Sequence, residues 1–220
     1  MRRLIIILPL LLIALTTVAV GRWDRNTLGP TVDTNAPAQE PQNDASVAQE
    51  QRQAIIASPL PSAYYRVTKK PFGIFVSPKK SPVNPERFTG YHTGVDFETG
   101  PSEQQFDLPV SAICTGNILA MRAVSGYGGV VVQACRIQEQ DVTVVYGHLR
   151  LSSINGSVGE SLERAQPFGV LGAGLTAETD KERKHLHLAI HKGTAINTAG
   201  YVSTASQLSD WIDAQGWLEP

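Results

Sequence analysis

The sequence predicts a mainly β protein, a small antiparallel sandwich or barrel-like domain. Residues 130–135 form a run rich in β-branched side chains, and Val142, Val144, Tyr146 and His148 alternate along the next segment. A repeat of two places such residues on one face of a strand. These segments follow one another closely and are joined by turns rich in Gly and Asn, and we find no helices that could connect parallel strands.

The chain is long enough for one good-sized domain with appendages. It has 220 residues and a formal net charge of -1, so no overall basic surface indicates a nucleic-acid partner. We expect residues 1–21 to be a signal peptide or an uncleaved signal anchor, residues 22–60 a tether, and residues 61–220 a folded domain.

The N-terminal segment is typical of export. Two arginines precede an apolar run of 17 residues, Leu4 to Val20, and cleavage after Ala19 or Gly21 would leave small residues at the required positions. An uncleaved membrane anchor is the alternative, and both interpretations place the rest of the chain outside the cytoplasm. Residues 22–58 are rich in Pro, Asn, Gln and Ala and lack the apolar side chains of a core, which indicates a flexible tether.

Order is expected to begin near Tyr64. Residues 110–120 read as a strand, a glycine turn and a second strand, and residues 206–217 as a terminal helix. The cysteines at 114 and 135 flank a Gly-rich turn, and an exported chain permits a disulfide between them. Two buried free thiols are the alternative, since the sequence does not determine the register of the two strands.

Two residues that can bind a metal occur between Gly90 and Asp96. His92 and Asp96 lie four residues apart, too far in an extended strand to share an ion, but Gly94 between them permits the necessary bend. Taken alone, this segment is more typical of a surface histidine beside a structural aspartate.

A second candidate is the His-x-His pair of His185 and His187. On a strand, this spacing puts both imidazoles on one face. The apolar neighbours Leu186, Leu188 and Ile190 indicate that the strand packs into a core rather than lying in a solvated tail.

The histidine motifs together predict a metal centre. Two imidazoles and one carboxylate make a three-ligand zinc set that leaves a fourth position for water. Two further histidines, one of them His148, can then move protons and stabilise an oxyanion. His191 would lie roughly 13 Å from His187 along an extended strand, so we expect it to be a surface residue.

The order Gly-x-His-x-Gly-x-Asp, Tyr-Gly-His-Leu, His-Leu-His resembles that of the lysostaphin and LytM-type peptidoglycan zinc endopeptidases. The resemblance runs from about Phe72 to Ile196 and includes the turn at residues 126–128. It implies an antiparallel β-sandwich with the active site in a groove between loops. The residues that match the family's Zn²⁺ ligands are His92, Asp96 and His187, and those that match its catalytic pair are His148 and His185.

The resemblance therefore implies that residues 61–220 are a zinc metallopeptidase domain, and that the chain is an exported enzyme of the cell envelope that cuts peptide bonds in bacterial peptidoglycan. We expect a monomer that acts on stem or cross-bridge peptides and touches the membrane only through an uncleaved N-terminal segment. The chain departs from the family in lacking a Gly shortly before the His-x-His and an aromatic after it; the charged loop 176–184 is expected to reshape the groove. An inactive wall-binding domain that activates another hydrolase, and an enzyme acting on a non-wall peptide, are the alternatives. The complete set of five residues favours an enzyme.

Overall fold

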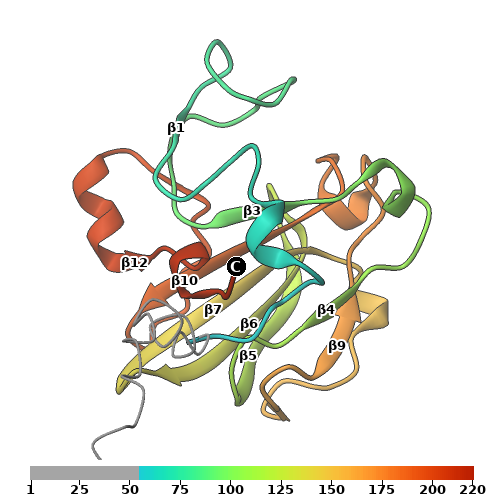
Figure 1. Ribbon diagram of the computed structural model, residues 1–220, viewed down its shortest axis with the longest axis vertical. Coiled ribbons are helices and arrows are strands. Elements are labelled where there is room, and N and C mark those ends of the chain that lie inside the picture. Colours follow the sequence, from blue (N-terminus) through green and yellow to red (C-terminus); the bar gives the residue numbers. More distant parts are fainter. Residues whose placement is uncertain (1–54) are drawn as a thin grey trace, which may run out of the picture. The chain divides into compact units, whose positions relative to one another are not determined.

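The computed structural model describes residues 55–220, so the predicted signal segment and most of the predicted tether lie outside the described part of the chain. The described part is mainly β, as predicted (Figure 1). Its strands are β1 (Phe75–Val76), β2 (Gly90–His92), β3 (Val95–Glu98), β4 (Pro109–Ser111), β5 (Gly116–Val124), β6 (Gly128–Ile137), β7 (Gln140–Leu149), β8 (Ser161–Leu162), β9 (Pro167–Val170), β10 (His185–Lys192), β11 (Tyr201–Val202) and β12 (Trp211–Ile212).

Helices contribute little to the described part of the chain. All are 3₁₀ helices: η1 (Ala63–Arg66), η2 (Pro101–Glu103), η3 (Leu151–Ser153), η4 (Ala177–Thr179), η5 (Ala205–Asp210) and η6 (Gln215–Trp217). No helix within residues 55–220 is both long and apolar enough to cross a membrane.

The expectation of one terminal helix over residues 206–217 was wrong. The segment is divided into η5, the short strand β12 and η6. Trp211 causes the interruption, because it pairs with His191 of β10 and is only 4% exposed. Burial of the indole against the sheet therefore outweighs the helical tendency of the neighbouring residues.

One large antiparallel sheet carries the fold. Its strand order is β12-β10-β7-β6-β5-β8, and β3 also pairs with β10 beyond the path. The long strands β5, β6 and β7 lie side by side in Figure 1, and among the described strands the sheet stays open and does not close into a barrel. Two small sheets, β1-β2-β11 and β4-β9, complete the domain.

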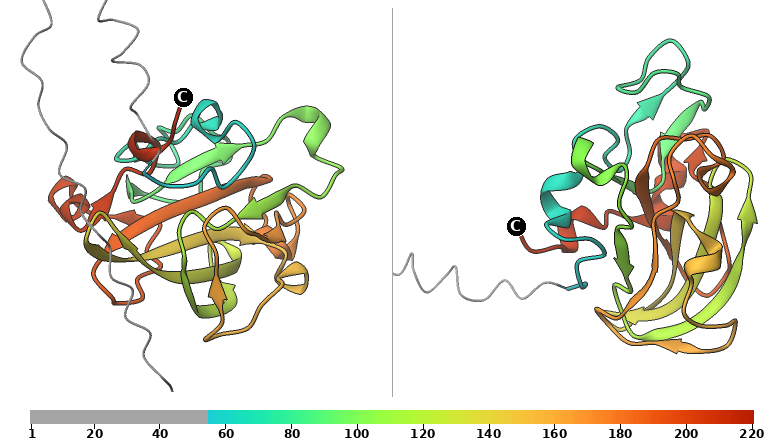
Figure 2. Two further views of the ribbon diagram at one scale, coloured as in Figure 1. Left: turned by 60° about the horizontal axis from the view of Figure 1, so that its bottom comes forward. Right: turned by 90° about the vertical axis from the view of Figure 1, so that its right-hand side faces the viewer.

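The two faces of the large sheet have different surroundings. Val142, Val144 and Tyr146 of β7 point into the main hydrophobic core, where Tyr146 meets Phe168 of β9 with ring centroids 5.0 Å apart. The β4-β9 sheet thus forms the second layer of a sandwich, and Figure 2 shows the layers from two other sides. Val145 points to the opposite face, which has a smaller apolar cluster and holds the candidate site.

Order begins earlier than Tyr64. Ile56 and Leu60 lie within the range predicted to be tether, yet they are 0% and 2% exposed and belong to the main core. The backbone N–H of Ala57 also donates to the carbonyl of Ile113 at 2.9 Å. Two well-spaced apolar side chains are enough to fix this segment, although the surrounding composition is polar.

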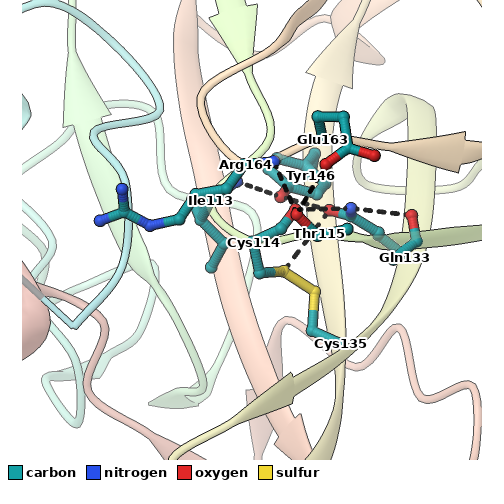
Figure 3. Close-up of a disulfide and its surroundings, with 9 residues drawn as sticks. Ile113, Cys114, Thr115, Gln133, Cys135, Tyr146, Glu163 and Arg164 are labelled. Atoms are coloured by element: carbon teal, nitrogen blue, oxygen red, sulfur yellow. Dashed lines mark hydrogen bonds between the residues drawn. A yellow bond between two sulfur atoms is a disulfide. The ribbon is translucent and has the colours of Figure 1, made fainter. Parts of the chain in front are cut away.

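The two cysteines form a disulfide, which decides between the alternatives left open by the sequence. Cys114 and Cys135 have Cα atoms 6.1 Å apart and lie 21 residues apart in the chain. Gln133 lies beside the bridge and accepts a hydrogen bond from the Tyr146 hydroxyl at 2.8 Å (Figure 3). The bridge thus joins the segment that leads into β5 to its neighbour β6.

Candidate metal centre

Strand pairing brings the first two candidate ligands together. In the antiparallel pair of β3 and β10, Asp96 lies directly opposite His187, and Glu98 lies opposite His185. Side chains that are directly opposed on antiparallel strands have Cβ atoms about 5 Å apart, so Asp96 and His187 reach a common point. The alternation along β10 puts His185 and His187 on the site face and leaves Leu186 in the main core.

His92 reaches the same point because the chain turns sharply between β2 and β3. Gly94 lies in this turn, and a Cβ atom there would overlap the backbone carbonyl of Leu188 and the imidazole of His187. The glycine is therefore needed because the backbone passes very close to β10. The bend expected from the sequence is present, and it places His92 and Asp96 beside each other.

Three donor atoms form a compact triangle at this point. His92 Nε2 lies 3.0 Å from His187 Nδ1 and 3.2 Å from Asp96 Oδ1, and His187 Nδ1 lies 3.1 Å from Asp96 Oδ1. Ligand atoms of a tetrahedral zinc site are separated by about 3.3 Å, given Zn–N and Zn–O bonds of about 2.0–2.1 Å. The spacing of the three atoms therefore fits one face of a zinc tetrahedron.

The outer nitrogens of both imidazoles have partners that leave the inner nitrogens free to bind a metal. His92 Nδ1 donates to the carbonyl of Pro71 at 3.3 Å, because a carbonyl oxygen can only accept. His187 Nε2 lies 3.2 Å from the Tyr127 hydroxyl. Such outer partners fix the tautomer and the orientation of metal-binding histidines.

The protonation states also suit a metal. Burial disfavours the charged form of Asp96, but its electrostatic interactions with His185 and His92 and its hydrogen bonds with His185 and His187 outweigh burial and hold the pKa of the carboxyl well below its usual range. Burial lowers the pKa of His187 to about 4, against the opposing effect of the hydrogen bond that the Asp96 carboxylate accepts from this ring. At neutral pH the site therefore offers a carboxylate and a neutral imidazole, the forms that bind metal ions.

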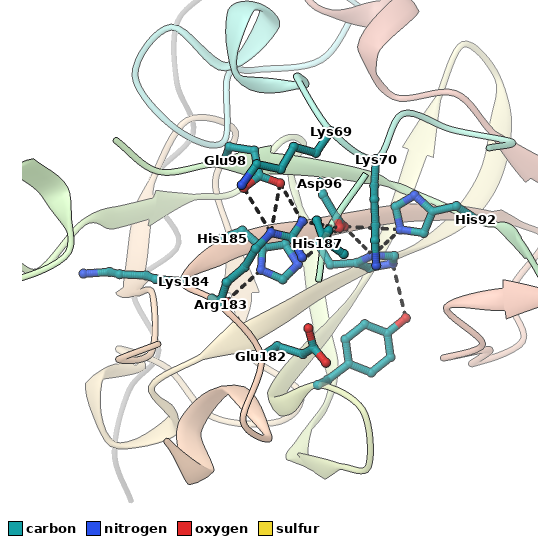
Figure 4. Close-up of polar contacts among 12 residues, drawn as sticks. Lys69, Lys70, His92, Asp96, Glu98, Glu182, Arg183, Lys184, His185 and His187 are labelled. Carbon is teal, nitrogen blue, oxygen red and sulfur yellow. Dashed lines mark hydrogen bonds and ion pairs between the residues drawn. The ribbon is translucent and has the colours of Figure 1, made fainter. Parts of the chain in front are cut away.

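His185 lies beside the triangle but contacts a different atom of Asp96. Its Nε2 is 3.3 Å from Asp96 Oδ2, whereas the two other histidines approach Oδ1 (Figure 4). Its Nδ1 donates to the carbonyl of Arg183 at 2.9 Å. His185 thus belongs to the site without being one of the three grouped donors, in keeping with the predicted division of the His-x-His pair, although the roles themselves stay a prediction.

His148 reaches the site through an irregularity that the sequence analysis missed. We expected it to share a face with Val142, Val144 and Tyr146, and this was wrong. The register between β6 and β7 shifts at Gly129 and Val130, and His148 is an extra residue with φ 64°. A β-bulge of this kind re-aims a side chain and is common beside active sites. The imidazole therefore turns to the site face, with its ring centroid 4.1 Å from that of His185.

The left-handed backbone at His148 costs about 1–2 kcal/mol for a residue with a Cβ. Its Nδ1 is also buried without a hydrogen-bond partner among the described residues. Burial, and then the charge of His185, hold the pKa of His148 well below its usual value. Strain and an unsatisfied buried nitrogen at one residue are typical of a position that acts on a ligand.

Tyr127 is a site residue that the sequence analysis treated only as part of a turn. Its ring packs over His187 with centroids 5.0 Å apart, and it lies 5.5 Å from His148. Gly147 makes this possible, because a Cβ atom there would overlap the Tyr127 ring. Burial, and then the negative charge of Asp96, raise the pKa of the phenol well above its usual value, so the hydroxyl stays protonated.

A buried ion pair supports the other side of the site and was also missed. Lys70 Nζ lies 2.6 Å from Glu86 Oε2, and both side chains are 2% exposed. The ammonium also donates to the Tyr201 hydroxyl at 2.9 Å, and the carbonyl of Lys70 accepts the backbone N–H of Asp96 at 3.0 Å. Tyr201 is opposite His92 in the pairing of β11 with β2, so the pair connects to two of the ligands.

These residues surround a cavity of about 330 Å³. Its walls come from loops that are far apart in the sequence, including the charged loop before β10, so the predicted site between loops is present. The lining residues are Lys70, Phe88, Thr89, Asp96, Ser125, Gly126, Tyr127, His148, Glu182, Arg183, His185, His187, Thr198, Ala199, Gly200 and Tyr201. His191 lies outside this lining, half-buried against Trp211.

This chain is similar to a known protein family and to several solved structures. Residues 90–198 match the model of peptidase family M23. Similar solved structures include the catalytic domain of the antimicrobial peptidase lysostaphin from Staphylococcus simulans, with 20% identity over 70% of this chain and 93% of that chain and a TM-score of 0.47. LytU has 21% identity over 70% and 90% of the two chains, with a TM-score of 0.45.

A zinc-containing peptidase from Vibrio cholerae has 20% identity over 71% of this chain and 39% of that chain, with a TM-score of 0.41. Among curated proteins, no sequence matches this chain. The family model is the most specific of these findings, because it covers the segment that contains all five predicted site residues. Through residues 90–198 the chain therefore belongs to peptidase family M23, as its resemblance to the lysostaphin and LytM-type enzymes implied.

Proposed function

We propose that this chain is an exported zinc metalloendopeptidase that hydrolyses peptide bonds in bacterial peptidoglycan. One observation carries the proposal: His92, Asp96 and His187 present three donor atoms 3.0–3.2 Å apart, with two more imidazoles and a phenol around them. His92, Asp96 and His187 would hold the ion. When bound, zinc supplies a Lewis acid that polarises a carbonyl and lowers the pKa of a water to about 7.

His185 is suited to carry a proton. Its Nδ1 already donates to the carbonyl of Arg183, so a hydrogen bond from Nε2 to Asp96 Oδ2 requires a second proton on the ring. The imidazolium is stabilised there by the carboxylate, and it can release its Nε2 proton to a leaving amine in the cavity. This is the work of a general acid, which typically contributes about 10²–10⁴-fold to a rate.

His148 and Tyr127 are suited to the opposite tasks. The neutral ring of His148 has an unsatisfied Nδ1, which can orient a water or accept its proton. If Tyr127 accepts from His187 Nε2, its own O–H is left to donate into the cavity, where it can stabilise a developing oxyanion. The bulge at His148 and the close approach allowed by Gly147 hold both groups ready before any substrate binds.

The substrate and the location rest on the sequence and the family. Membership of peptidase family M23 and the resemblance to lysostaphin and LytM-type enzymes support a stem or cross-bridge peptide as substrate. The Arg-Arg pair and apolar run at the N-terminus support export, as a secreted or membrane-anchored protein of the cell envelope. We propose that the domain acts as a monomer and binds no nucleic acid.

Digestion of purified peptidoglycan tests the proposal. The full chain is incubated with peptidoglycan, with and without a zinc chelator, and the released fragments are identified by mass spectrometry. New amino and carboxyl ends within the peptides, lost on chelation and restored by zinc, are expected. Binding to peptidoglycan without new ends would favour an inactive wall-binding domain, and cleavage of free peptides alone would favour a non-wall substrate.

A further inference from the structure

Arg183 contacts one of the three predicted ligands, although it is itself neither a predicted ligand nor a predicted catalytic residue. It follows Glu182 in the loop before β10, where the sequence departs from the lysostaphin-type pattern. One terminal nitrogen of its guanidinium lies 2.9 Å from Asp96 Oδ2 and also contacts Glu98 Oε1. Figure 4 shows Arg183 between the two carboxylates, whereas Lys184 points away from the cluster.

The contact divides the two oxygens of Asp96 between different partners. Oδ1 lies 3.2 Å from His92 Nε2 and 3.1 Å from His187 Nδ1. Oδ2 instead accepts a hydrogen bond from Arg183 and lies 3.3 Å from His185 Nε2. A carboxylate can rotate about its terminal bond, and it could also bind an ion through both oxygens. The guanidinium holds the carboxylate in one orientation, with a single oxygen directed at the triangle of donors.

Arg183 is itself held in place by Glu98. The Nε atom of Arg183 lies 3.1 Å and 3.0 Å from the two carboxylate oxygens of Glu98, so these hydrogen bonds fix the orientation of the planar guanidinium. The Arg183 side chain is 20% exposed and that of Glu98 is 11% exposed, so water screens these contacts only partly. Glu98 is opposite His185 in the register, which fixes its position on β3 relative to β10.

We infer that Arg183 is a positioning residue that orients Asp96 for metal binding through Oδ1 alone, with Glu98 as its anchor. The inference rests on the proposed zinc site. It completes a pattern in which each ligand has an outer partner: the Pro71 carbonyl for His92, the Tyr127 hydroxyl for His187 and the Arg183 guanidinium for Asp96. Loss of such a partner typically weakens metal affinity or activity about 10–100-fold.

The test measures zinc affinity of the full chain by competition with a chelator, without using peptidase activity. Arg183→Gln should raise the zinc dissociation constant about 10–100-fold. Arg183→Lys keeps the charge but lacks the planar fork, so it should restore only part of the affinity. Glu98→Gln should give a smaller loss in the same direction, because the guanidinium then loses a charged anchor.

Arg87→Gln is the matched control. Arg87 also contacts two acidic residues, Glu182 and Asp180, near the same loop, but it has no contact with the three donors. Its zinc affinity should equal that of the wild type. The melting temperatures of all metal-free variants are compared in parallel, so that a general loss of folding is separated from a loss of zinc.

Substitution with Co²⁺ supplies a readout that a merely structural role would not change. The visible absorption of bound cobalt reports its coordination, and a freely rotating Asp96 should alter this spectrum in Arg183→Gln. Zinc affinity equal to that of the wild type, or weaker affinity with an unaltered cobalt spectrum, would overturn the inference. Failure of the proposed zinc site is a distinct result, since the wild-type chain would then bind no zinc at all. Failure of the proposed activity is also distinct, since the wild-type chain would then bind zinc without cleaving peptidoglycan.

Discussion

The buried pair of Lys70 and Glu86 provides a sharp test of how the site is supported. The perturbation is Glu86→Gln, which preserves the size of the side chain. The one amide oxygen can still accept from the N–H of Phe88, and the amide NH2 can donate to the Ser81 hydroxyl instead of accepting from it. It removes the negative charge that lies 2.6 Å from the ammonium of Lys70. The Tyr201 hydroxyl is then the only remaining partner that the described structure provides for this ammonium.

The magnitude follows from burial. Both side chains are 2% exposed, so the remaining ammonium cannot be hydrated without local opening of the fold. Removing one partner of a buried ion pair costs about 3–5 kcal/mol. In a domain of this size each kcal/mol changes the melting temperature by about 2–4 °C, so we expect a fall of about 6–20 °C.

Thermal and urea unfolding at neutral pH provide the assay. The double variant Lys70→Met with Glu86→Gln should be more stable than Glu86→Gln alone, because the unpaired charge is gone. Asp141→Asn is the matched control. Asp141 Oδ1 lies 2.9 Å from the Arg136 guanidinium, but the two side chains are 54% and 60% exposed, so water screens the pair and we expect almost no loss of stability. A loss for Glu86→Gln as small as for Asp141→Asn would refute the reasoning.

Three further predictions concern the rest of the domain. Replacing Cys114 and Cys135 by Ala should lower the free energy of unfolding by about 3 kcal/mol, since the bridge closes a loop of some 20 residues; urea unfolding measures it, and an unchanged midpoint would contradict it. The hydrogen bond from Arg66, against desolvation, lowers the pKa of Glu103 to about 2, so this pair stabilises above about pH 4.5 and is lost as pH falls towards 2. Glu103→Gln should therefore remove up to about 1 kcal/mol at pH 6 but less at pH 2.5, and equal losses at both would argue against it. Deleting residues 22–54 should leave the melting temperature nearly unchanged, whereas a deletion extended to residue 60 should lower it, because Ile56 and Leu60 are in the core.

The parts of the site that depend on strand periodicity were predictable. His-x-His on a strand puts two imidazoles on one face whatever the partner strands are, and β10 has this arrangement. The bend between His92 and Asp96 was predictable because a shared site needs it, although Gly94 is required for space beside Leu188 rather than for an unusual backbone angle. The two-layered antiparallel architecture followed from closely spaced strands without connecting helices.

The parts that depend on irregular or long-range contacts were not predictable. An extra residue in one strand changes the face of every side chain after it. The segment Tyr-Gly-His-Leu contains no sequence signal that predicts the bulge at His148. The pairing of Lys70 with Glu86 joins positions on separate irregular segments, and composition alone does not distinguish a buried pair from two surface charges. Tyr127 had a recognisable signal, an aromatic within a Gly-rich turn beside the predicted site, which could have been weighed as a cavity residue.

The zinc content of two single variants, purified in parallel, tests the central claim most directly. His187→Ala removes Nδ1 from the triangle of donors, so it should lose zinc and also stability, because metal binding is coupled to folding. His185→Ala removes a ring that contacts Asp96 Oδ2, so it should retain close to one zinc per chain. Loss of zinc from His185→Ala together with its retention by His187→Ala would contradict the assignment of the metal centre.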